Sequence, residues 1–202
     1  MKDRKWIRVL LICMGMLAVL YFSAAFVLIN GPDPTFSETS VFSISSAENE
    51  GIVEMLKQDY EFQEHRFEAR DGASLYARHY AADAGVTLLL LHGLSGNSYT
   101  FNTTCGKIRK AMDAEIYALD HRGHGESAGR RGDVDYIGQY EDDVADVIAK
   151  IRAAKPEGRL ILAGHSMGGG IALRYAMKNN PSDVDGYLLF APHLGFNSPT
   201  AD

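Results

Sequence analysis

Ser166 stands at the centre of a pentapeptide, Gly164-His165-Ser166-Met167-Gly168, that fits the pattern G-x-S-x-G. An apolar run precedes this segment and a helix-like run follows it, which is the context in which such a serine acts as a nucleophile. A serine on so tight a turn adopts a strained backbone, and side chains two positions away would collide with it, so glycine is expected there. The pattern predicts a nucleophilic serine; the alternative is a glycine-rich turn in an ordinary α/β protein.

Three glycines, residues 168–170, occupy the first turn of the predicted helix after Ser166. Each costs about 1 kcal/mol relative to alanine, which makes sense if the helix packs closely on neighbouring backbone and directs its amino end at a developing negative charge.

Residues 91–96 (LHGLSG) directly follow an apolar run. A backbone N–H there could complete an oxyanion hole with the N–H of Met167.

Residues 120–127 (DHRGHGES) follow the next predicted strand and are rich in glycine, as a loop on the same edge of the sheet would be. The two histidines, His121 and His124, could serve as metal ligands or general bases. Neither has a carboxylate or histidine partner at a recognisable ligand spacing, so a structural role in the loop is favoured. We expect no metal site and no cofactor.

Six segments are predicted to be strands that position these loops. The first two flank the turn signal Asp71-Gly72, as antiparallel strands do. The third (VTLLLL) is continuously apolar, which is typical of a parallel strand covered on both faces. The six predicted strands span residues 62–67, 75–80, 86–91, 114–119, 160–163 and 187–190.

Three predicted helices alternate with these strands, which indicates an α/β fold with a mostly parallel sheet and right-handed crossovers. The third helix begins at Ser166 and ends near Lys178. The apolar face of the first consists of Phe101, Cys105, Ile108 and Met112, and that of the second consists of Ile137, Tyr140, Val144, Val147 and Ile151.

Four acidic residues of the second helix, Glu141, Asp142, Asp143 and Asp146, are predicted to lie opposite its apolar face. A cluster of carboxylates could bind a metal ion. We favour a solvated helix face over that alternative.

Residues 9–29 form an uncharged apolar run of 21 positions, close to the ~20 helical residues that cross a bilayer core. The run predicts a transmembrane anchor; a signal peptide cleaved near residues 23–25 and a buried core helix are the alternatives. Basic residues are concentrated in residues 1–8 and absent from residues 31–56. The positive-inside rule therefore predicts a single-pass protein with a cytoplasmic amino terminus and its body on the non-cytoplasmic side, periplasmic or extracellular.

Residues 30–59 are predicted to be a linker that ends in a short helix, because Ser45-x-x-Glu48 fits a capping box. Residues 60–202 are then the folded domain.

Residues 30–202 contain 16 Lys and Arg against 25 Asp and Glu, a net charge of −9, which disfavours nucleic acid as a partner. Cys13 and Cys105 lie in environments too different for a disulfide.

HGLSG, DHRGHGES and GHSMGGG, in this order and about 30 to 40 residues apart, resemble the α/β-hydrolase superfamily. Within it they are most similar to the monoacylglycerol lipase, lysophospholipase and serine aminopeptidase S33-like group. The resemblance covers about residues 60–193 and implies an α/β-hydrolase fold. It implies that Ser166 is the nucleophile and that the N–H groups of Leu94 and Met167 form the oxyanion hole.

The same resemblance implies a triad acid and a triad histidine in later strands, and neither is identifiable here. After Ser166 the sequence contains one histidine, His193, and the acids Asp183, Asp185 and Asp202. His193 follows the sixth strand, where the family begins its lid region, and is a weak candidate for the base. We expect a truncated hydrolase with about six strands, in which the last one is an uncovered edge.

Three functions remain open on this sequence. The first is a membrane-anchored serine hydrolase that cleaves carboxylic esters of the lipid type through an acyl-enzyme on Ser166. The second is a noncatalytic module on the same scaffold, favoured by the unidentified triad members. The third is an amidase or aminopeptidase, because the pocket that distinguishes amides from esters is not identifiable.

Overall fold

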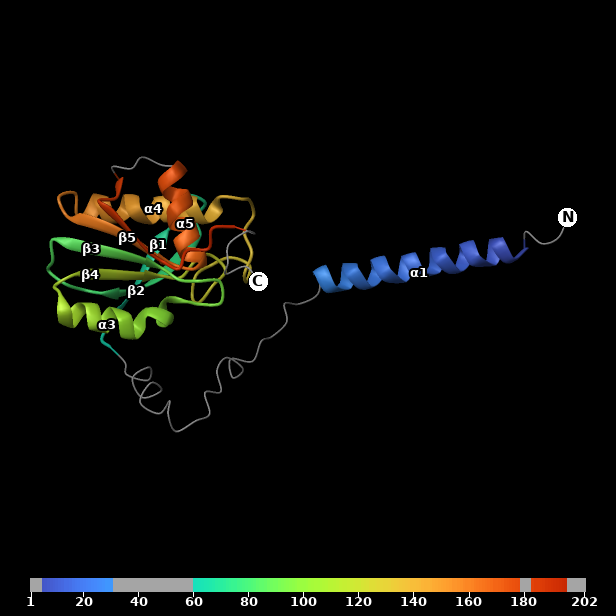
Figure 1. The fold of residues 1–202 in the computed structure, drawn as a ribbon, viewed down its shortest axis with the longest axis horizontal. Coiled ribbons are helices and arrows are strands. Elements are labelled where there is room, and N and C mark those ends of the chain that lie inside the picture. Colours follow the sequence, from blue (N-terminus) through green and yellow to red (C-terminus); the bar gives the residue numbers. More distant parts are fainter. Residues whose placement is uncertain (1–4, 31–59, 179–182, 196–202) are drawn as a thin grey trace, which may run out of the picture. The chain divides into compact units, whose positions relative to one another are not determined.

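The computed structural model describes residues 5–30, 60–178 and 183–195 (Figure 1). The chain divides into two units, Met1–Ser43 and Ile44–Asp202. The helix predicted to follow Ser45 lies outside the described residues. The hydrolase-like part of the chain, which carries all of the predicted chemistry, lies in the second unit.

The first unit contains helix α1, Lys5–Asn30. Side chains are described for residues 13–24 and for Phe26, and the large apolar ones among them are exposed. Across the described part of the chain, no helix has the length and hydropathy that crossing a membrane requires. A helix is therefore present where the sequence predicts one, but its membrane-spanning character is not confirmed.

The second unit is built on a six-stranded sheet with the order β1-β2-β4-β3-β5-β6. Its strands are β1 Gln63–Glu68, β2 Ser74–Tyr80, β3 Val86–Leu91, β4 Glu115–Leu119, β5 Arg159–His165 and β6 Gly186–Phe190. β1 and β2 are antiparallel to each other, and β2 is antiparallel to β4, whereas β3 to β6 run parallel. The predicted mostly parallel sheet is confirmed, and each strand lies where the sequence predicts it.

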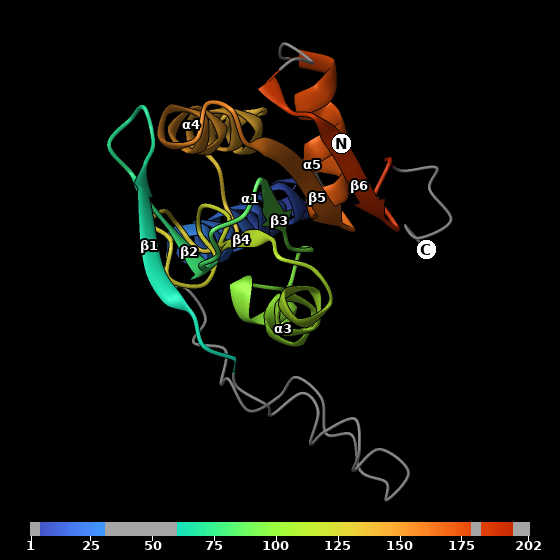
Figure 2. The ribbon, with the colours of Figure 1, turned by 90° about the vertical axis from the view of Figure 1, so that its left-hand side faces the viewer.

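Helices cover both faces of this sheet. The 3-10 turn η3 (Ser98–Phe101) and α3 (Asn102–Ala111) lie on one face, and α4 (Gln139–Ala154) and α5 (Met167–Lys178) lie on the other (Figures 1 and 2). Side chains of a strand alternate between the two faces. Leu89 and Leu91 of β3 accordingly join the core under α4 and α5, whereas Leu88 and Leu90 join the core under α3.

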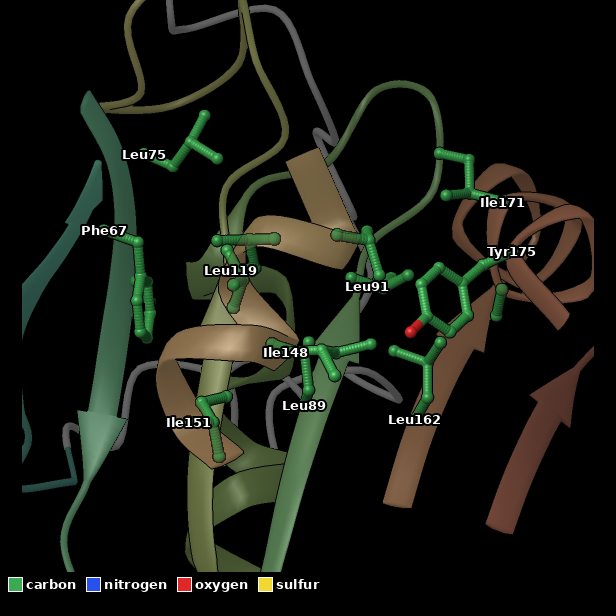
Figure 3. Close-up of a cluster of buried hydrophobic side chains, with 14 of the residues drawn as sticks. Phe67, Leu75, Leu89, Leu91, Leu119, Ile148, Ile151, Leu162, Ile171 and Tyr175 are labelled. Atoms are coloured by element: carbon green, nitrogen blue, oxygen red, sulfur yellow. The ribbon is translucent and has the colours of Figure 1, made fainter. Parts of the chain in front are cut away.

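The larger core lies between the sheet and helices α4 and α5 (Figure 3). Leu89, Leu162 and Ile148 meet near its middle and are 0%, 0% and 2% exposed. Replacing a leucine buried in this way by alanine costs about 2 to 5 kcal/mol. The continuous apolar run of β3 is thus explained by burial on both faces, as predicted.

The apolar face predicted for α4 is correct except for its first residue, Ile137. Ile137 is 88% exposed and precedes the helix, which begins at Gln139 after Gly138. Gly138 adopts φ = 103°, a left-handed conformation that turns the chain just before the helix. The sequence period alone does not reveal that this glycine delays the start of the helix to Gln139.

The prediction that the acidic residues of α4 form a solvated face is wrong for two of the four. Glu141 and Asp143 are each 4% exposed. Arg174 on α5 pairs with Glu141, and Arg122 in the loop after β4 pairs with Asp143. The arginines offset the energetic cost of burying the two carboxylates. The ion pairs also join α4 to α5 and to the loop after β4.

The last strand, β6, is an edge of the sheet, as the sequence predicts. Leu188, Leu189 and Phe190 are 43%, 37% and 45% exposed. Among the described residues no element covers both faces of β6, and the strand therefore presents apolar side chains to solvent.

Candidate active site

The register of the parallel strands brings the predicted functional loops to one edge of the sheet. Leu91, the last residue of β3, lies opposite Leu119 of β4 and Gly164 of β5. His165 lies opposite Phe190, the last residue of β6. The segments that follow these four strands therefore start at the same level and gather at one edge (Figure 1). Ligands of parallel α/β sheets bind at this carboxyl edge.

Ser166 occupies the turn between β5 and α5 and has φ = 51°. Positive φ is uncommon for a residue with a side chain, and strain of this kind concentrates at functional sites. Three backbone hydrogen bonds hold the turn: the Ser166 N–H donates to the Phe190 carbonyl (3.0 Å), and the Ser166 carbonyl accepts from the N–H groups of Gly170 (3.0 Å) and His193 (2.9 Å). The serine is thus fixed between its own helix and the segment after β6.

The glycines around Ser166 lie in contact with backbone. A Cβ atom at Gly164 would collide with the carbonyl of Gly168, and a Cβ atom at Gly168 would collide with the carbonyl of Leu91. A Cβ atom at Gly170 would come within 2.5 Å of the His193 carbonyl oxygen. The first turn of α5 therefore packs closely on neighbouring backbone, which is the reason that the sequence suggested for these glycines.

The loop after β3 lies directly beside Ser166. A Cβ atom at Gly93 would be only 3.2 Å from the Ser166 Cβ atom. Leu94 follows Gly93, and Met167 follows Ser166 as the first residue of α5. Within the described residues neither the Leu94 N–H nor the Met167 N–H donates a hydrogen bond to another group. An oxyanion hole needs two free donors, and these two N–H groups belong to segments that meet at Ser166.

His92 organises this loop from the buried side. Its Nδ1 donates to the Gly93 carbonyl (2.7 Å), and its Nε2 accepts from the backbone N–H of His121 (3.1 Å). These two bonds fit the neutral Nδ1–H tautomer. Burial lowers the pKa of His92 to about 4, so the ring is uncharged at neutral pH. Sequence reasoning missed this role, because a histidine after a strand carries no signal of its partners.

Asp120 anchors the loop after β4. One carboxylate oxygen accepts from the Ser98 N–H (2.5 Å) and the other accepts from the Glu126 N–H (2.8 Å). Gly125 has φ = 50°, and a Cβ atom there would collide with this carboxylate. The Asp120 side chain therefore joins the loop after β4 to the turn η3 before α3.

Arg122 holds the same loop to α4 and to the turn between β1 and β2. It is 6% exposed and donates to both carboxylate oxygens of Asp143 (2.6 and 2.9 Å). Its other ion pair joins it to Asp71 (2.8 Å). The hydrogen bonds to Asp143 raise the pKa of Arg122, which therefore stays charged. The arginine was visible in the sequence, but nothing in the sequence identified its partners.

The two histidines after β4 have structural contacts, as predicted. His121 is buried, its Nε2 lies 3.1 Å from the His92 carbonyl, and burial lowers its pKa well below its usual range. The ring of His124 contacts two backbone carbonyls, those of Arg122 and Leu94 (3.0 Å each). Within the described chain, no group of three or more His, Cys, Asp or Glu side chains is placed to hold a metal ion.

Among residues 60–178 and 183–195, no side chain forms a hydrogen bond with the Ser166 hydroxyl, so no base for it is found there. His193 is exposed and reaches Ser166 through its backbone N–H. Asp185 precedes β6, at the opposite edge of the sheet, and pairs with Arg152 (2.6 Å). Asp183 is two residues further from the site, and Asp202 lies outside the described residues. Of these residues, the three that the structure describes, His193, Asp183 and Asp185, are not placed as triad partners.

A parallel sheet of this strand order, with a strained serine after β5 and free backbone donors beside it, defines an α/β hydrolase. The profile of the serine aminopeptidase S33 family matches residues 82–201. This chain belongs to that family. The match begins just before β3 and includes all three of the loops described above.

Curated relatives and solved structures agree with this assignment. Monoglyceride lipase of Rattus norvegicus is 28% identical over 133 residues, which are 65% of this chain and 43% of the relative. Monoacylglycerol lipase of Mycolicibacterium smegmatis is 30% identical over 105 residues, 52% of this chain and 37% of the relative. The α/β hydrolase GrgF from a Penicillium species superposes with a TM-score of 0.58 at 20% identity, over 66% of this chain and 46% of its own. The chain spans less than half the length of these relatives.

Proposed function

We propose that this chain carries the nucleophile and oxyanion hole of a serine hydrolase that cleaves carboxylic esters of the lipid type. The observation that supports this most is the strained Ser166, with φ = 51° and with Gly93 packed against its Cβ atom. The free N–H groups of Leu94 and Met167 add to it.

In the proposed reaction the Ser166 oxygen attacks the ester carbonyl carbon while the hydroxyl proton passes to a base. The carbonyl oxygen becomes an oxyanion that the N–H groups of Leu94 and Met167 stabilise. The intermediate collapses to an acyl-enzyme as the alcohol leaves with a proton. Water then attacks the acyl-enzyme, which releases the carboxylic acid and restores the serine. The base in these steps is not among the described side chains.

Two observations support a lipid-type acyl group. Relatives that match this part of the chain are named monoglyceride lipase and monoacylglycerol lipase. Exposed apolar side chains also stand near the carboxyl edge of the sheet, where Leu94, Phe190 and Leu194 are 67%, 45% and 64% exposed. An acyl chain bound along this edge would bury apolar surface. The matching family is described as serine aminopeptidases, so an amide substrate is the alternative within the same mechanism.

We also propose attachment to a membrane through residues 9–29, with residues 60–202 on the non-cytoplasmic side. The charge-free sequence, its basic flank and the exposed apolar side chains of α1 support the proposal. Protease added to intact spheroplasts should digest residues 60–202. Protection of that region until the cells are lysed would contradict the orientation.

A fluorophosphonate probe tests the serine assignment in the longest natural form of the protein. The wild type should be labelled at Ser166 and should hydrolyse a monoacylglycerol. Ser166→Ala should lose both the label and the hydrolysis, whereas Ser95→Ala, a serine in the neighbouring loop, should keep both. A form that hydrolyses esters with full activity after Ser166→Ala would overturn the proposal.

A noncatalytic module is the second candidate function. It is favoured by one observation, which is that no described side chain hydrogen-bonds to the Ser166 hydroxyl. It predicts that the longest natural form binds a monoacylglycerol without turning it over and that the fluorophosphonate leaves Ser166 unlabelled. The experiment above therefore separates the two functions.

A further inference from the structure

His124 bridges two loops in a way that the proposed reaction does not use. Its Nε2 lies 3.0 Å from the Leu94 carbonyl oxygen, and its Nδ1 lies 3.0 Å from the Arg122 carbonyl oxygen. A carbonyl oxygen only accepts hydrogen bonds, so each ring nitrogen must donate. Only the imidazolium carries a proton on both nitrogens. A neutral His124 keeps one of the two bonds and loses the other.

The contact to Leu94 matters because it adjoins the proposed oxyanion donor. The Gly93 carbonyl accepts from His92 Nδ1 (2.7 Å) and from the Gly96 N–H (3.0 Å). This carbonyl belongs to the same planar peptide as the Leu94 N–H, which therefore points the opposite way. The next peptide plane carries the Leu94 carbonyl, which His124 holds. His92 and His124 thus fix the peptide planes on the two sides of Leu94.

Three aromatic rings from three segments surround His124. His92 of the loop after β3 lies 5.2 Å away between ring centroids, His121 of the loop after β4 lies 6.2 Å away, and Tyr140 of α4 lies 6.3 Å away. Burial lowers the pKa of both His92 and His121. These two rings are therefore uncharged at neutral pH and place no positive charge beside His124.

The charged side chains of the same loop are engaged elsewhere. The guanidinium of Arg122 pairs with Asp143 and Asp71, and the carboxylate of Asp120 accepts from two backbone N–H groups. His124 itself is only partly buried. Its ring can therefore exchange protons with solvent.

We propose that His124 is a positioning residue that acts as a proton-dependent latch on the oxyanion loop, residues 92–96. When both nitrogens are protonated, His124 ties the Leu94 carbonyl to the loop after β4 and holds the Leu94 N–H toward Ser166. Loss of one proton frees the oxyanion loop from this tie. The latch itself follows from the contacts of His124, whereas its effect on catalysis rests on the proposed function.

Two substitutions separate the ring nitrogens. His124→Gln places an amide N–H near the position of Nε2 and should keep the bond to Leu94 without titrating. His124→Asn places an amide N–H near the position of Nδ1 and should keep only the bond to Arg122. His124→Ala removes both donors. The Asn variant is therefore a matched control for the Gln variant, since both keep one amide donor and differ in which loop it reaches.

The first measurement is hydrogen exchange of the Gly96 amide, which closes the turn of the oxyanion loop, by NMR on the full chain. Exchange at low pH should be about tenfold faster in the Asn and Ala variants than in the wild type, and nearly unchanged in the Gln variant. Under conditions where the ring ¹⁵N shifts show that only one nitrogen of His124 is protonated, the wild type should approach the Asn variant. Equal exchange in all four proteins would overturn the latch, as would equal acceleration in the Asn and Gln variants.

The second measurement is the rate at which a fluorophosphonate inactivates the longest natural form. The Asn variant should react about tenfold more slowly through the chemical step with the same probe affinity, and the Gln variant should restore the rate. If the wild type is not labelled at all, the proposed function fails while the exchange experiment still decides the latch. If the wild type is labelled and the Asn variant reacts at the same rate, the effect of the latch on catalysis is refuted.

Discussion

The two sides of Ser166 differ sharply. Toward β3 and β4 the serine faces loops that are buried and densely hydrogen-bonded, with His92, Asp120 and Arg122 each 6% exposed or less. Toward β6 it faces Phe190 and His193, which touch the serine only through backbone and leave their side chains exposed. Under the proposed function, the side that would stabilise an oxyanion carries both backbone donors, whereas the side that would move a proton carries no suitable group among the described residues.

Under the proposed function, the site has an oxyanion half and a proton-transfer half, and the two halves have separate structural origins. The oxyanion half follows from strand register, glycine contacts and buried polar groups within residues 74–168. The proton-transfer half needs side chains that reach Ser166 from elsewhere. The predictions below test how independent the two halves are.

The largest effect expected is on turnover. The 202-residue chain should hydrolyse a short-chain p-nitrophenyl ester far more slowly than a complete serine hydrolase, because Ser166 lacks a described base. Loss of the base in such an enzyme lowers kcat by roughly 10⁶, while the oxyanion hole and binding keep roughly 10³ to 10⁴ over water. Hydrolysis at ordinary enzyme rates would instead make His193 the candidate base, with His193→Ala as the check.

The next largest effect is on the free energy of unfolding, through the buried ion pair that holds the loop after β4. Asp143→Ala leaves the buried Arg122 without its main partner and should lower the free energy of unfolding by about 3 to 5 kcal/mol. Asp146→Ala, on the same helix, breaks a more exposed pair with Arg70 and should cost about 1 kcal/mol or less. Urea denaturation of the full chain measures both. Equal losses would mean that the burial of Asp143 carries no special weight.

The third effect is a pH dependence of the free energy of unfolding, caused by the buried His92. Burial lowers the pKa of His92 to about 4 in the folded protein, whereas an unfolded histidine titrates near 6.5. The unfolded state therefore binds more protons between these values, and stability should fall by about 3 kcal/mol as pH drops from about 6.5 to about 4. His92→Asn keeps a donor near Nδ1 but does not titrate, so its loss over this pH range should be smaller. An unchanged pH profile in that variant would contradict the assignment.

The smallest effect is expected on the β6 side. Leu188→Ser changes a side chain that is 43% exposed, so the free energy of unfolding should fall by only about 1 kcal/mol. The same change should reduce self-association through the apolar edge, as sedimentation would show. The matched control, Leu162→Ala on the neighbouring strand, removes a fully buried leucine and should cost about 2 to 5 kcal/mol.

Local patterns in the sequence were enough to predict the strands, the helices and the turn at Ser166. Apolar runs of β3 and β5 and the glycines at 164 and 168 report on constraints that act within a few residues. The partners of Glu141, Asp143 and Arg122 were not predictable, because each pair joins elements far apart in the chain. The sequence favoured a structural role for His124 but did not reveal its partners, and it missed the role of His92, because both histidines bond to backbone groups that any residue could supply.

The close approach of backbone around Ser166 also bears on how this site can change during evolution. The serine already bears the strain of a positive φ, so another small residue at position 166 would meet no new obstruction. Side chains at Gly164 or Gly168 would strike backbone that cannot yield. Substitutions are therefore tolerated more easily at position 166 than at its flanking glycines, so a homologue could lose the proposed nucleophile and still keep this turn.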